Sequence, residues 1–323
     1  MGTALRAERV SSELKYKLTE NKQEVLSRGS KRGLALLVLL LIGASTAAAQ
    51  PAPSFPSETA ARLKQQIQNG SSEEKRSALF EIRNLRSPDA SSIAVPALRD
   101  ADLLVRATAT ASVVFLPKED AARALLPLLS DKDEFVRQET AYALGKVGDA
   151  SATANLIGLM QKDKSREVRT AAALSLGSIG DISAVESLLN ILRTRPREDE
   201  EFLRRGAARS IGQIAQIIET GDHSVLTPQN HLPDKYKKLD NGSTSPAGFG
   251  AAVPILINVL KNTAESDDSR REAAFALGAI GDEKAVPALR MFVSSNDTYM
   301  AEISREALLK IETRKNKAAS DNK

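Results

Sequence analysis

Residues 168–181 read VRTAAALSLGSIGD, and this fourteen-residue pattern returns without a gap at two other places in the chain. Residues 136–149 read VRQETAYALGKVGD, and residues 269–282 read SRREAAFALGAIGD. A divergent copy, LRRGAARSIGQIAQ, occupies residues 203–216. Weaker copies begin at Glu74, Val105 and Ile303. Seven copies in one register indicate that the chain is built from an internal repeat.

Each copy of the unit is predicted to be an α-helix. Its positions 1, 5, 9 and 12 lie on one side of a helix that turns by about 100° per residue, so they form one buried stripe. Position 9 is always a branched aliphatic residue: Ile82, Val113, Leu144, Leu176, Ile211, Leu277 and Ile311. Successive position-9 residues are 31, 31, 32, 35, 66 and 34 residues apart, so one interval contains a repeat with an insertion.

A second helix is predicted before each unit. Segments that open with an aliphatic residue and proline mark these helices: 95–98, 126–129, 253–256 and 286–289. Proline fits a first helical turn, where an amide donor would lack a partner in any case. The Gly-Asp pair that ends several units gives a helix stop and a turn. Two helices per repeat predict an all-α stack of about seven helix pairs, and no strand pattern competes.

Composition agrees with packed helices, because the chain is 42% hydrophobic but only 4% aromatic and has no tryptophan. The net charge of the 323 residues is +4, yet residues 1–49 alone contain eight basic and four acidic side chains. The remaining residues carry 37 of each sign, so the predicted folded part gives no support for nucleic-acid binding. The absence of cysteine excludes disulfides, thiolate zinc sites and cysteine nucleophiles.

The first 49 residues are predicted to be a leader. Lys31 and Arg32 precede an apolar run at 33–42, which has the length of a signal-peptide core and is short for a membrane span. Small residues precede the expected cleavage after Ala49. The leader predicts export to the periplasm or out of the cell. The alternative is an uncleaved inner-membrane anchor formed by residues 33–49.

The signature V-R-x-x-A-A-x-A-L-G-x-I-G-D, followed by A-V-P-x-L, resembles the HEAT-like repeats first described in phycobilisome lyases. The resemblance covers residues 57–312, and together with the leader it identifies an exported bacterial HEAT-repeat protein. It implies a right-handed α-α superhelix that holds partners along a curved surface, with the second helix of each repeat on the concave wall. We therefore expect a leader at 1–49, a Pro-rich linker at 50–56, the repeat solenoid at 57–312 and a disordered tail at 313–323.

Arginine recurs at position 2 of the unit, often with an aspartate one turn earlier, such as Asp102 or Asp133. The arginines are Arg106, Arg137, Arg169, Arg204 and Arg270. They are candidates for a phosphate or carboxylate site. The resemblance favours the structural alternative, in which Asp–Arg contacts fix the register of neighbouring repeats.

Positions 3 and 7 of the unit point away from the buried stripe and lie one helical turn apart. Close relatives usually carry a charged residue at position 7, but this chain has aromatic or aliphatic residues in several copies. The candidate partner-binding residues at these two positions are Arg76, Phe80, Gln138, Tyr142, Leu174, Arg205, Arg209, Arg271 and Phe275. Exposed aromatics beside arginine are typical of protein-binding surfaces. The alternative is that the rings pack against the helix of a neighbouring repeat.

The long insertion at 219–250 is rich in turn-forming residues and is predicted to be a loop. Both histidines of the chain, His223 and His231, lie in it. Two histidines on a loop fall short of the three or four ligands that a metal site requires. We therefore expect no metal and no cofactor, and the insertion is expected to be either an exposed interaction loop or a disordered segment.

The resulting prediction is a non-catalytic scaffold that holds a protein partner on the concave face, in the cell envelope or outside the cell. Deoxyhypusine hydroxylase has a similar solenoid, but its iron is bound through His-Glu pairs, and neither His223 nor His231 is followed by Glu. A lyase acting on a protein-bound chromophore resembles the repeats, yet the leader argues for export. DNA-repair HEAT folds need a basic channel, which the charge balance opposes. The alternative in another class is a structural envelope protein without a discrete ligand.

Overall fold

The computed structural model describes residues 56–221, 223 and 246–321 of the 323 residues. In these ranges every regular element is an α-helix or a 3-10 helix, so the predicted all-α class is confirmed. The predicted leader, nearly all of the linker and the centre of the insertion lie outside the described residues. No helix within the described ranges has the length and apolar character that crossing a membrane requires.

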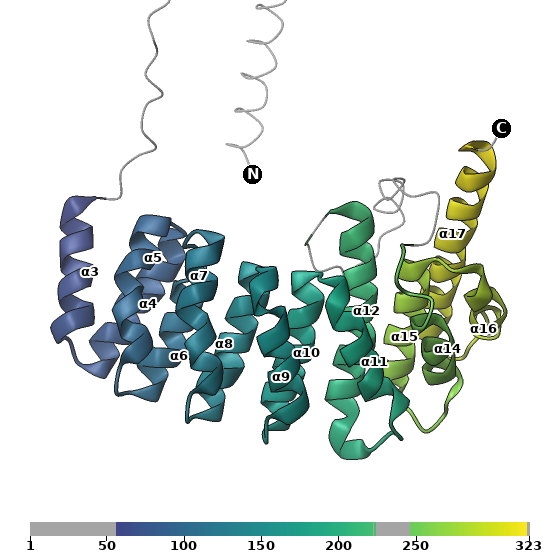
Figure 1. Cartoon of the computed structure of the whole chain (residues 1–323), viewed down its shortest axis with the longest axis horizontal. Helices are drawn as coiled ribbons and strands as arrows, with labels where there is room; N and C mark the ends of the chain where they lie inside the picture. The colour runs from purple at the N-terminus through teal and green to yellow at the C-terminus, as the bar shows by residue number, and fades with distance from the viewer. Residues whose placement is uncertain (1–55, 222, 224–245, 322–323) are drawn as a thin grey trace, which may run out of the picture. The chain divides into compact units, whose positions relative to one another are not determined.

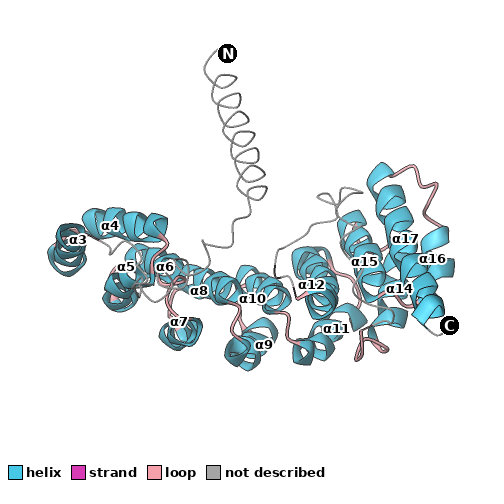
Figure 2. Ribbon diagram, turned by 90° about the horizontal axis from the view of Figure 1, so that it is seen from above, coloured by secondary structure: helices cyan, strands magenta, loops and turns pink. Residues whose placement is uncertain are grey.

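The helices of residues 56–321 form two layers in chain order (Figure 1). The inner layer holds the fourteen-residue units, in α4 (Ser72–Leu85), α6 (Leu103–Ser112), α8 (Glu134–Val147), α10 (Arg166–Ile179), α12 (Glu201–Thr220), α15 (Asp267–Ile280) and α17 (Thr298–Asp321). The outer layer holds α3 (Ser57–Asn69), α5 (Pro88–Ala94), α7 (Lys118–Leu125), α9 (Thr153–Lys162), α11 (Val185–Arg193), α14 (Ala252–Lys261) and α16 (Val286–Arg290). Seen from above, the layer of repeated units lines the inner side of this row of helix pairs (Figure 2).

Short 3-10 helices complete most of the outer layer. They are η1 (Val95–Arg99), η2 (Leu126–Ser130), η3 (Ala150–Ala152), η4 (Ile182–Ala184), η5 (Glu198–Glu200) and η7 (Glu283–Ala285). The prolines at 96 and 127 begin η1 and η2 instead of opening an α-helix, and α5 and α7 precede them. Because proline lacks an amide donor, the chain changes from α to 3-10 hydrogen bonding there.

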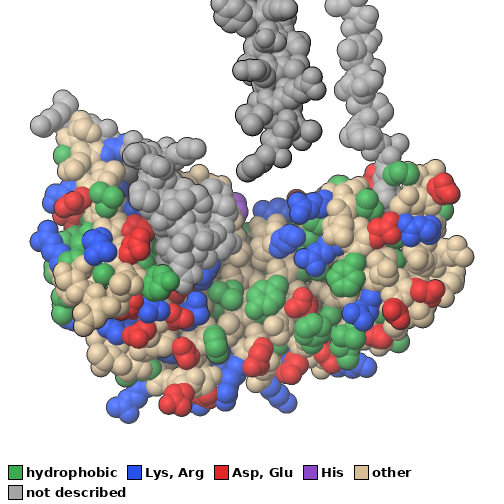
Figure 3. Space-filling model, turned by 180° about the vertical axis from the view of Figure 1, so that it is seen from behind, with side chains coloured by type: hydrophobic (Ala, Val, Ile, Leu, Met, Phe, Trp, Pro, Cys, Tyr) green, Lys and Arg blue, Asp and Glu red, His purple; other side chains and the backbone are tan. Residues whose placement is uncertain are grey.

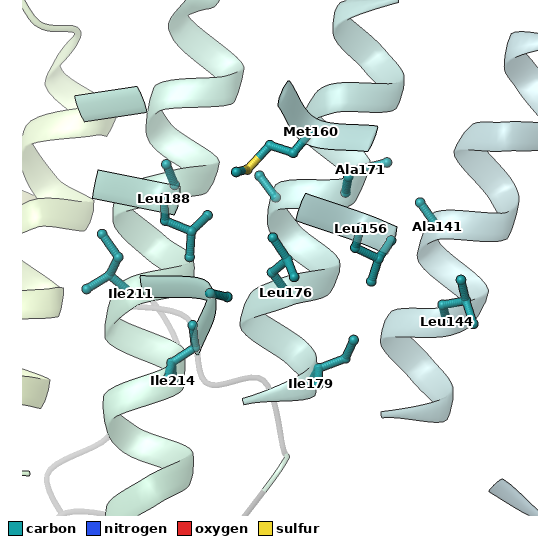
Figure 4. Packing of buried hydrophobic residues seen from close by; sticks show 14 of the residues in the cluster. Ala141, Leu144, Leu156, Met160, Ala171, Leu176, Ile179, Leu188, Ile211 and Ile214 are labelled. Atoms are coloured by element: carbon teal, nitrogen blue, oxygen red, sulfur yellow. The ribbon is translucent and has the colours of Figure 1, made fainter. Parts of the chain in front are cut away.

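The core lies between the two layers and consists of aliphatic and alanine side chains. Leu156 and Met160 of α9 point toward Leu176 of α10, and Leu188 of α11 lies near Ile211 of α12 (Figure 4). All five side chains are fully buried. Each repeat therefore buries its apolar stripe against its own pair and its neighbours, which is the packing expected of a solenoid.

Neighbouring inner helices approach closely because glycine occupies position 10 of several units. A Cβ atom added at Gly145 would lie 2.8 Å from the Cβ of Ser175. Ser175 Oγ in turn donates a hydrogen bond to the carbonyl of Ala141, at 2.7 Å. The equivalent serine of the next repeat, Ser210, donates to Ala173 at 2.8 Å. Small residues thus bring the helices into contact, and the serine hydroxyl satisfies a carbonyl of the preceding helix.

Four of the five arginines at position 2 link successive repeats, which confirms the structural interpretation for them, whereas Arg270 pairs with Asp267 of its own helix. Arg106 Nε lies 2.8 Å from Asp131 Oδ2, and Arg137 Nε lies 2.7 Å from Asp163 Oδ2. Asp102 and Asp133, expected as the partners, instead accept hydrogen bonds from the first amides of α6 and α8. They act as helix caps. Further links of the same kind are Lys75–Asp100, Arg169–Glu200 and Arg204–Glu265.

Most inner helices end at a glycine in the left-handed conformation: Gly148, Gly180, Gly221 and Gly281. The end of α4 differs, because Arg86 occupies the equivalent place with a φ of 49°. Among the described residues Arg86 is the one non-glycine residue with positive φ. The left-handed conformation costs a residue with a Cβ roughly 1–2 kcal/mol.

The tail from residue 313 was predicted to be disordered, and this prediction is wrong for its described part. Helix α17 continues to Asp321. Arg314, 8% exposed, holds it in place: its Nε donates to Glu219 Oε1 at 2.9 Å and its Nη2 to the carbonyl of Ala279 at 2.9 Å. Composition alone suggested a solvated segment, but one buried arginine fixes the helix against the end of α12.

Candidate functional site

Two adjoining hollows lie on the inner face of α8, α10 and α12. Their volumes are about 550 and 360 Å3, and both are lined by Tyr142, Thr170, Leu174 and Phe202. We call them together the Tyr142 hollow. Figure 3 views this face and shows hydrophobic side chains between charged ones. Both hollows are open to solvent, so they suit an extended segment better than an enclosed small molecule.

Four of the expected binding residues form one wall and the far rim of the Tyr142 hollow. Gln138 and Tyr142 lie one turn apart on α8, and Arg205 and Arg209 lie on α12. The Tyr142 ring is 41% exposed. Partial burial raises the pKa of its hydroxyl, and a hydrogen bond with Gln138 acts in the opposite direction.

Leu174 forms the floor between these walls. It is half-buried, and a Cβ atom added at Gly206 of α12 would lie 3.5 Å from Leu174 Cδ2. Because residue 206 has no side chain, the Leu174 side chain stays exposed to the hollow. Sequence analysis expected Gln138, Tyr142, Leu174, Arg205 and Arg209 on one surface, and the structure brings these five together.

The two arginines of the rim are paired with carboxylates of α15. Arg205 Nη1 lies 2.8 Å from Asp268 Oδ2, and Arg209 Nη1 lies 3.4 Å from Glu272 Oε1. Glu272 is 4% exposed, and burial raises its pKa although both arginines oppose the rise. Its other carboxylate oxygen has no hydrogen-bond partner among the described residues. The rim is therefore close to neutral.

The other four expected residues lie away from the hollow. Arg76 and Phe80 are on α4, where the Phe80 ring is 48% exposed. Arg271 on α15 is paired with Asp297, at 2.8 Å. Phe275 was expected at the surface but is only 3% exposed.

The burial of Phe275 follows from the glycine that faces it. A Cβ atom added at Gly212 of α12 would lie 2.8 Å from Phe275 Cε1. The ring therefore packs against the neighbouring repeat, which is the alternative that the sequence left open. We correct the expectation for Phe275: its role is in packing between repeats.

Phe202 is the residue of the hollow that sequence reasoning missed. It is 70% exposed and directly precedes position 1 of its unit. Leu104 and Phe135 occupy the same place in two other units, and each is 42% exposed. An apolar residue at this place in three units was a usable signal, because helical spacing puts it near position 7 on the same face.

The described residues contain no group of three or more potential metal ligands. The ring of His223 lies against α10, with Nδ1 3.3 Å from the carbonyl oxygen of Ser178. His231 lies outside the described residues.

Helix pairs stacked in this order, with the repeated unit on the inner layer, define an α-solenoid. The family of HEAT repeats matches residues 60–145 and 122–212, and the family of PBS lyase HEAT-like repeats matches residues 269–295. The chain belongs to the HEAT-repeat proteins. The predicted resemblance is thereby confirmed.

Among curated proteins, deoxyhypusine hydroxylase of Schizosaccharomyces pombe is 43% identical over 65 residues. The match spans 20% of this chain and 20% of that protein, so it covers a fifth of the relative's length. Among solved structures, human deoxyhypusine hydroxylase with glycerol is 21% identical, with a TM-score of 0.36 over 79% of this chain and 96% of that one. The complex of CpcE and CpcF of phycocyanin lyase from Nostoc is 20% identical, with a TM-score of 0.43 over 84% of this chain and 97% of that one.

The prediction that the chain is not an enzyme is contradicted by the curated relative. Repeats of this kind occur in a hydroxylase, as the name of that protein states. The absence of a familiar catalytic pattern does not exclude an enzyme. A repeat scaffold and an enzyme share the same helices, so the fold does not separate them.

Proposed function

We propose that the Tyr142 hollow binds a segment of a protein partner, and that the chain acts as a scaffold in the cell envelope or outside the cell. The observation that carries the proposal is the exposure of two aromatic rings, Tyr142 at 41% and Phe202 at 70%, on the walls of one hollow. Aromatic residues dominate binding energy at protein interfaces because a rigid ring buries much apolar area at little entropic cost.

The rings do little for the fold, which supports a role in binding. Burying a large apolar side chain contributes about 1.5–3 kcal/mol, and Phe202 leaves most of that contribution unused. Phe275, at the equivalent place to Tyr142, shows that this position of the repeat is able to bury its ring. Apolar side chains grouped on one surface are the usual mark of an interaction site.

A photo-reactive phenylalanine analogue at position 202 tests the proposal in the native host. We expect irradiation to give one protein adduct, with the attached peptide mapping to a single segment of the partner. The matched control is the same analogue at Asn155, an exposed residue of α9 in the outer layer. We expect no adduct there.

Equal adducts at both positions contradict a specific surface. Association with wall or membrane fractions without any adduct supports the alternative, a structural envelope protein without a discrete ligand.

A further inference from the structure

Four cations lie where α4 and α8 end, and two of them line a hollow that shares Tyr142 with the Tyr142 hollow. Arg83 and Arg86 stand at the end of α4, Lys146 is in the last turn of α8, and Lys118 begins α7. All four side chains are exposed, and we call them the basic cluster. Lys118, Lys146 and Tyr142 line one hollow of about 500 Å3. Lys and Arg side chains are visible along the upper edge of this face (Figure 3).

The basic cluster has no ion-pair partner in the described part of the chain. None of its four side chains forms an ion pair within 4.0 Å with any carboxylate in the described ranges, whereas the arginines that link the repeats all do. Lys146 Nζ instead lies 4.9 Å from the centre of the Phe115 ring. Burial, and then the charges of Arg83 and Arg86, lower the pKa of Lys146. Like charges are therefore concentrated here, and an anion would relieve their repulsion.

Two carboxylates lie near the basic cluster without neutralising it. Burial raises the pKa of Glu139, and Arg83 opposes that rise. The amide of Ser151 and, less strongly, Lys118 lower the pKa of Asp149.

Helix stability alone does not account for the cluster. Cations at the end of a helix interact favourably with its dipole, which suffices for Arg83 and Lys146 taken singly. However, α10, α12 and α15 have no basic residue in their last turn. Among the inner helices described, only α4 and α8 thus carry a basic residue in the last turn.

The backbone of Arg86 is strained, which is a second indication of a functional role. It takes the left-handed conformation that glycine takes at the ends of α8, α10, α12 and α15. Any residue with a Cβ is disfavoured there, and strain of this kind concentrates at functional sites. The fold alone would be better served by glycine.

We propose that the basic cluster binds the acidic part of a protein segment whose apolar side chains enter the Tyr142 hollow. The proposal rests on the proposed function and names the chemistry of its partner. A nucleic-acid strand fits less well, because the arginines on the other side of the hollow are already paired, Arg166 with Asp199 and Arg169 with Glu200. The exposed Glu198 beside them would repel phosphates. Salt dependence is expected for such a charged contact.

Selection of random peptides displayed on phage, with the full chain as bait, tests the proposal. We expect the enriched peptides to join a run of Asp or Glu to aromatic or aliphatic residues. A synthetic peptide of the enriched sequence then serves as the probe for fluorescence anisotropy. Its Kd should rise with ionic strength between low and physiological salt.

The variant Arg86→Gly distinguishes a role in binding from a role in folding, because it should weaken binding without lowering stability. Glycine relieves the strained φ, so the melting temperature should stay the same or increase, while the Kd for the acidic peptide rises about tenfold. Lys146→Gln should also raise the Kd for the acidic peptide. The matched control is Arg123→Gln, an exposed arginine of α7 outside the cluster, which should leave the Kd unchanged.

The outcomes distinguish the two proposals. If no peptide is enriched, the proposed function and this inference both fail. If enriched peptides lack acidic residues, or Arg86→Gly and Lys146→Gln leave the Kd unchanged while Tyr142→Ser raises it, the inference alone fails. A single-stranded oligonucleotide that binds more tightly than the peptide and depends on Arg86 overturns the inference in favour of nucleic acid.

Discussion

Tyr142 and Phe275 occupy the same position in two copies of the repeat, yet one ring faces solvent and the other is buried. The preceding inner helix makes the difference for Phe275, because Gly212 leaves room for its ring. Before Tyr142 the equivalent position holds Val114. Sequence periodicity placed both rings on the side of the helix that points away from the buried stripe. It did not give the distance to the neighbouring helix, which decides whether such a ring is covered.

Glu306 and Lys310 form a buried pair on α17. Lys310 Nζ lies 3.5 Å from Glu306 Oε1, and each side chain is 13% exposed. Burial raises the pKa of Glu306 to about 7, although Lys310 opposes the rise. Burial also lowers the pKa of Lys310, although Glu306 opposes that change. Removal from water therefore outweighs the attraction between the two charges.

We predict that this pair makes the stability of the protein pH-dependent. A carboxyl with a raised pKa binds an extra proton in the folded state, so stability falls as pH rises from 4.5 to about 7. Glu306→Gln removes this titration. Relative to the parent, the variant should gain on the order of 2 kcal/mol between about pH 5 and pH 8.

Urea unfolding at the two pH values measures this gain. Glu302→Gln, at an exposed place on the same helix, is the control and should show no such gain. A difference between Glu306→Gln and the parent that does not change with pH contradicts the assignment.

At the scale of the element, contacts between successive inner helices depend on glycine at position 10. A Cβ atom added at Gly177 would lie 2.6 Å from Ser210 Oγ and 2.7 Å from Ser210 Cβ. A Cβ atom added at Gly158 of α9 would lie in open space, with no contacting atom within 4 Å. The two glycines sit in neighbouring helices, but only one of them lies at a contact between repeats.

We predict opposite effects for alanine at these two places. Gly177→Ala should destabilise the protein by about 1–3 kcal/mol, because the close approach of α10 and α12 is forced apart. Gly158→Ala should stabilise it by about 0.5–1 kcal/mol, because alanine is the better helix former. Chemical denaturation of both variants measures the two changes in stability. Equal changes for Gly177→Ala and Gly158→Ala would contradict the packing of α10 against α12.

The sequence predicted the elements well where the repeat is regular. Helix pairs and their order follow from hydrophobic periodicity and from the Gly-Asp stops, and the resemblance to HEAT-like repeats implied the inner position of the repeated unit. The sequence did not predict the partners of the linking arginines. Arg106 pairs with Asp131 of the next repeat and not with the nearby Asp102. Helix α17 was also missed beyond residue 312, because Arg314 is fixed by the distant Glu219.

At the scale of the whole molecule, our proposal that the protein is exported rests on the predicted leader. If residues 31–49 form a cleaved signal, the mature protein begins at Gln50. N-terminal sequencing of protein purified from the native host gives the answer. An intact leader on protein in the cytosolic fraction would contradict export, and an intact leader in the membrane fraction would support the anchored alternative.

The candidate site was predictable in part for the same reason that the fold was. Five of the nine expected residues meet at the Tyr142 hollow because positions 3 and 7 share a face in every copy. Phe202 occupies a place that is apolar in three units, whereas the basic cluster depends on a local departure from the repeat, with arginine in place of glycine at position 86. Departures of this kind become meaningful once neighbouring helices are placed side by side.

The central claim is that the Tyr142 hollow binds a protein segment, and one matched pair of variants tests it. Tyr142→Ser and Phe275→Ser remove an aromatic ring from the same position of two repeats, and the photo-reactive analogue at position 202 reports on binding. We predict that Tyr142→Ser lowers the adduct about tenfold, equivalent to about 1.4 kcal/mol, and leaves the melting temperature unchanged.

Phe275→Ser should do the reverse. Opening a buried site of this size costs about 3–5 kcal/mol, so the melting temperature should fall by several degrees or more, while the adduct persists below that temperature. A Tyr142→Ser protein that melts normally and still gives the full adduct would contradict the account.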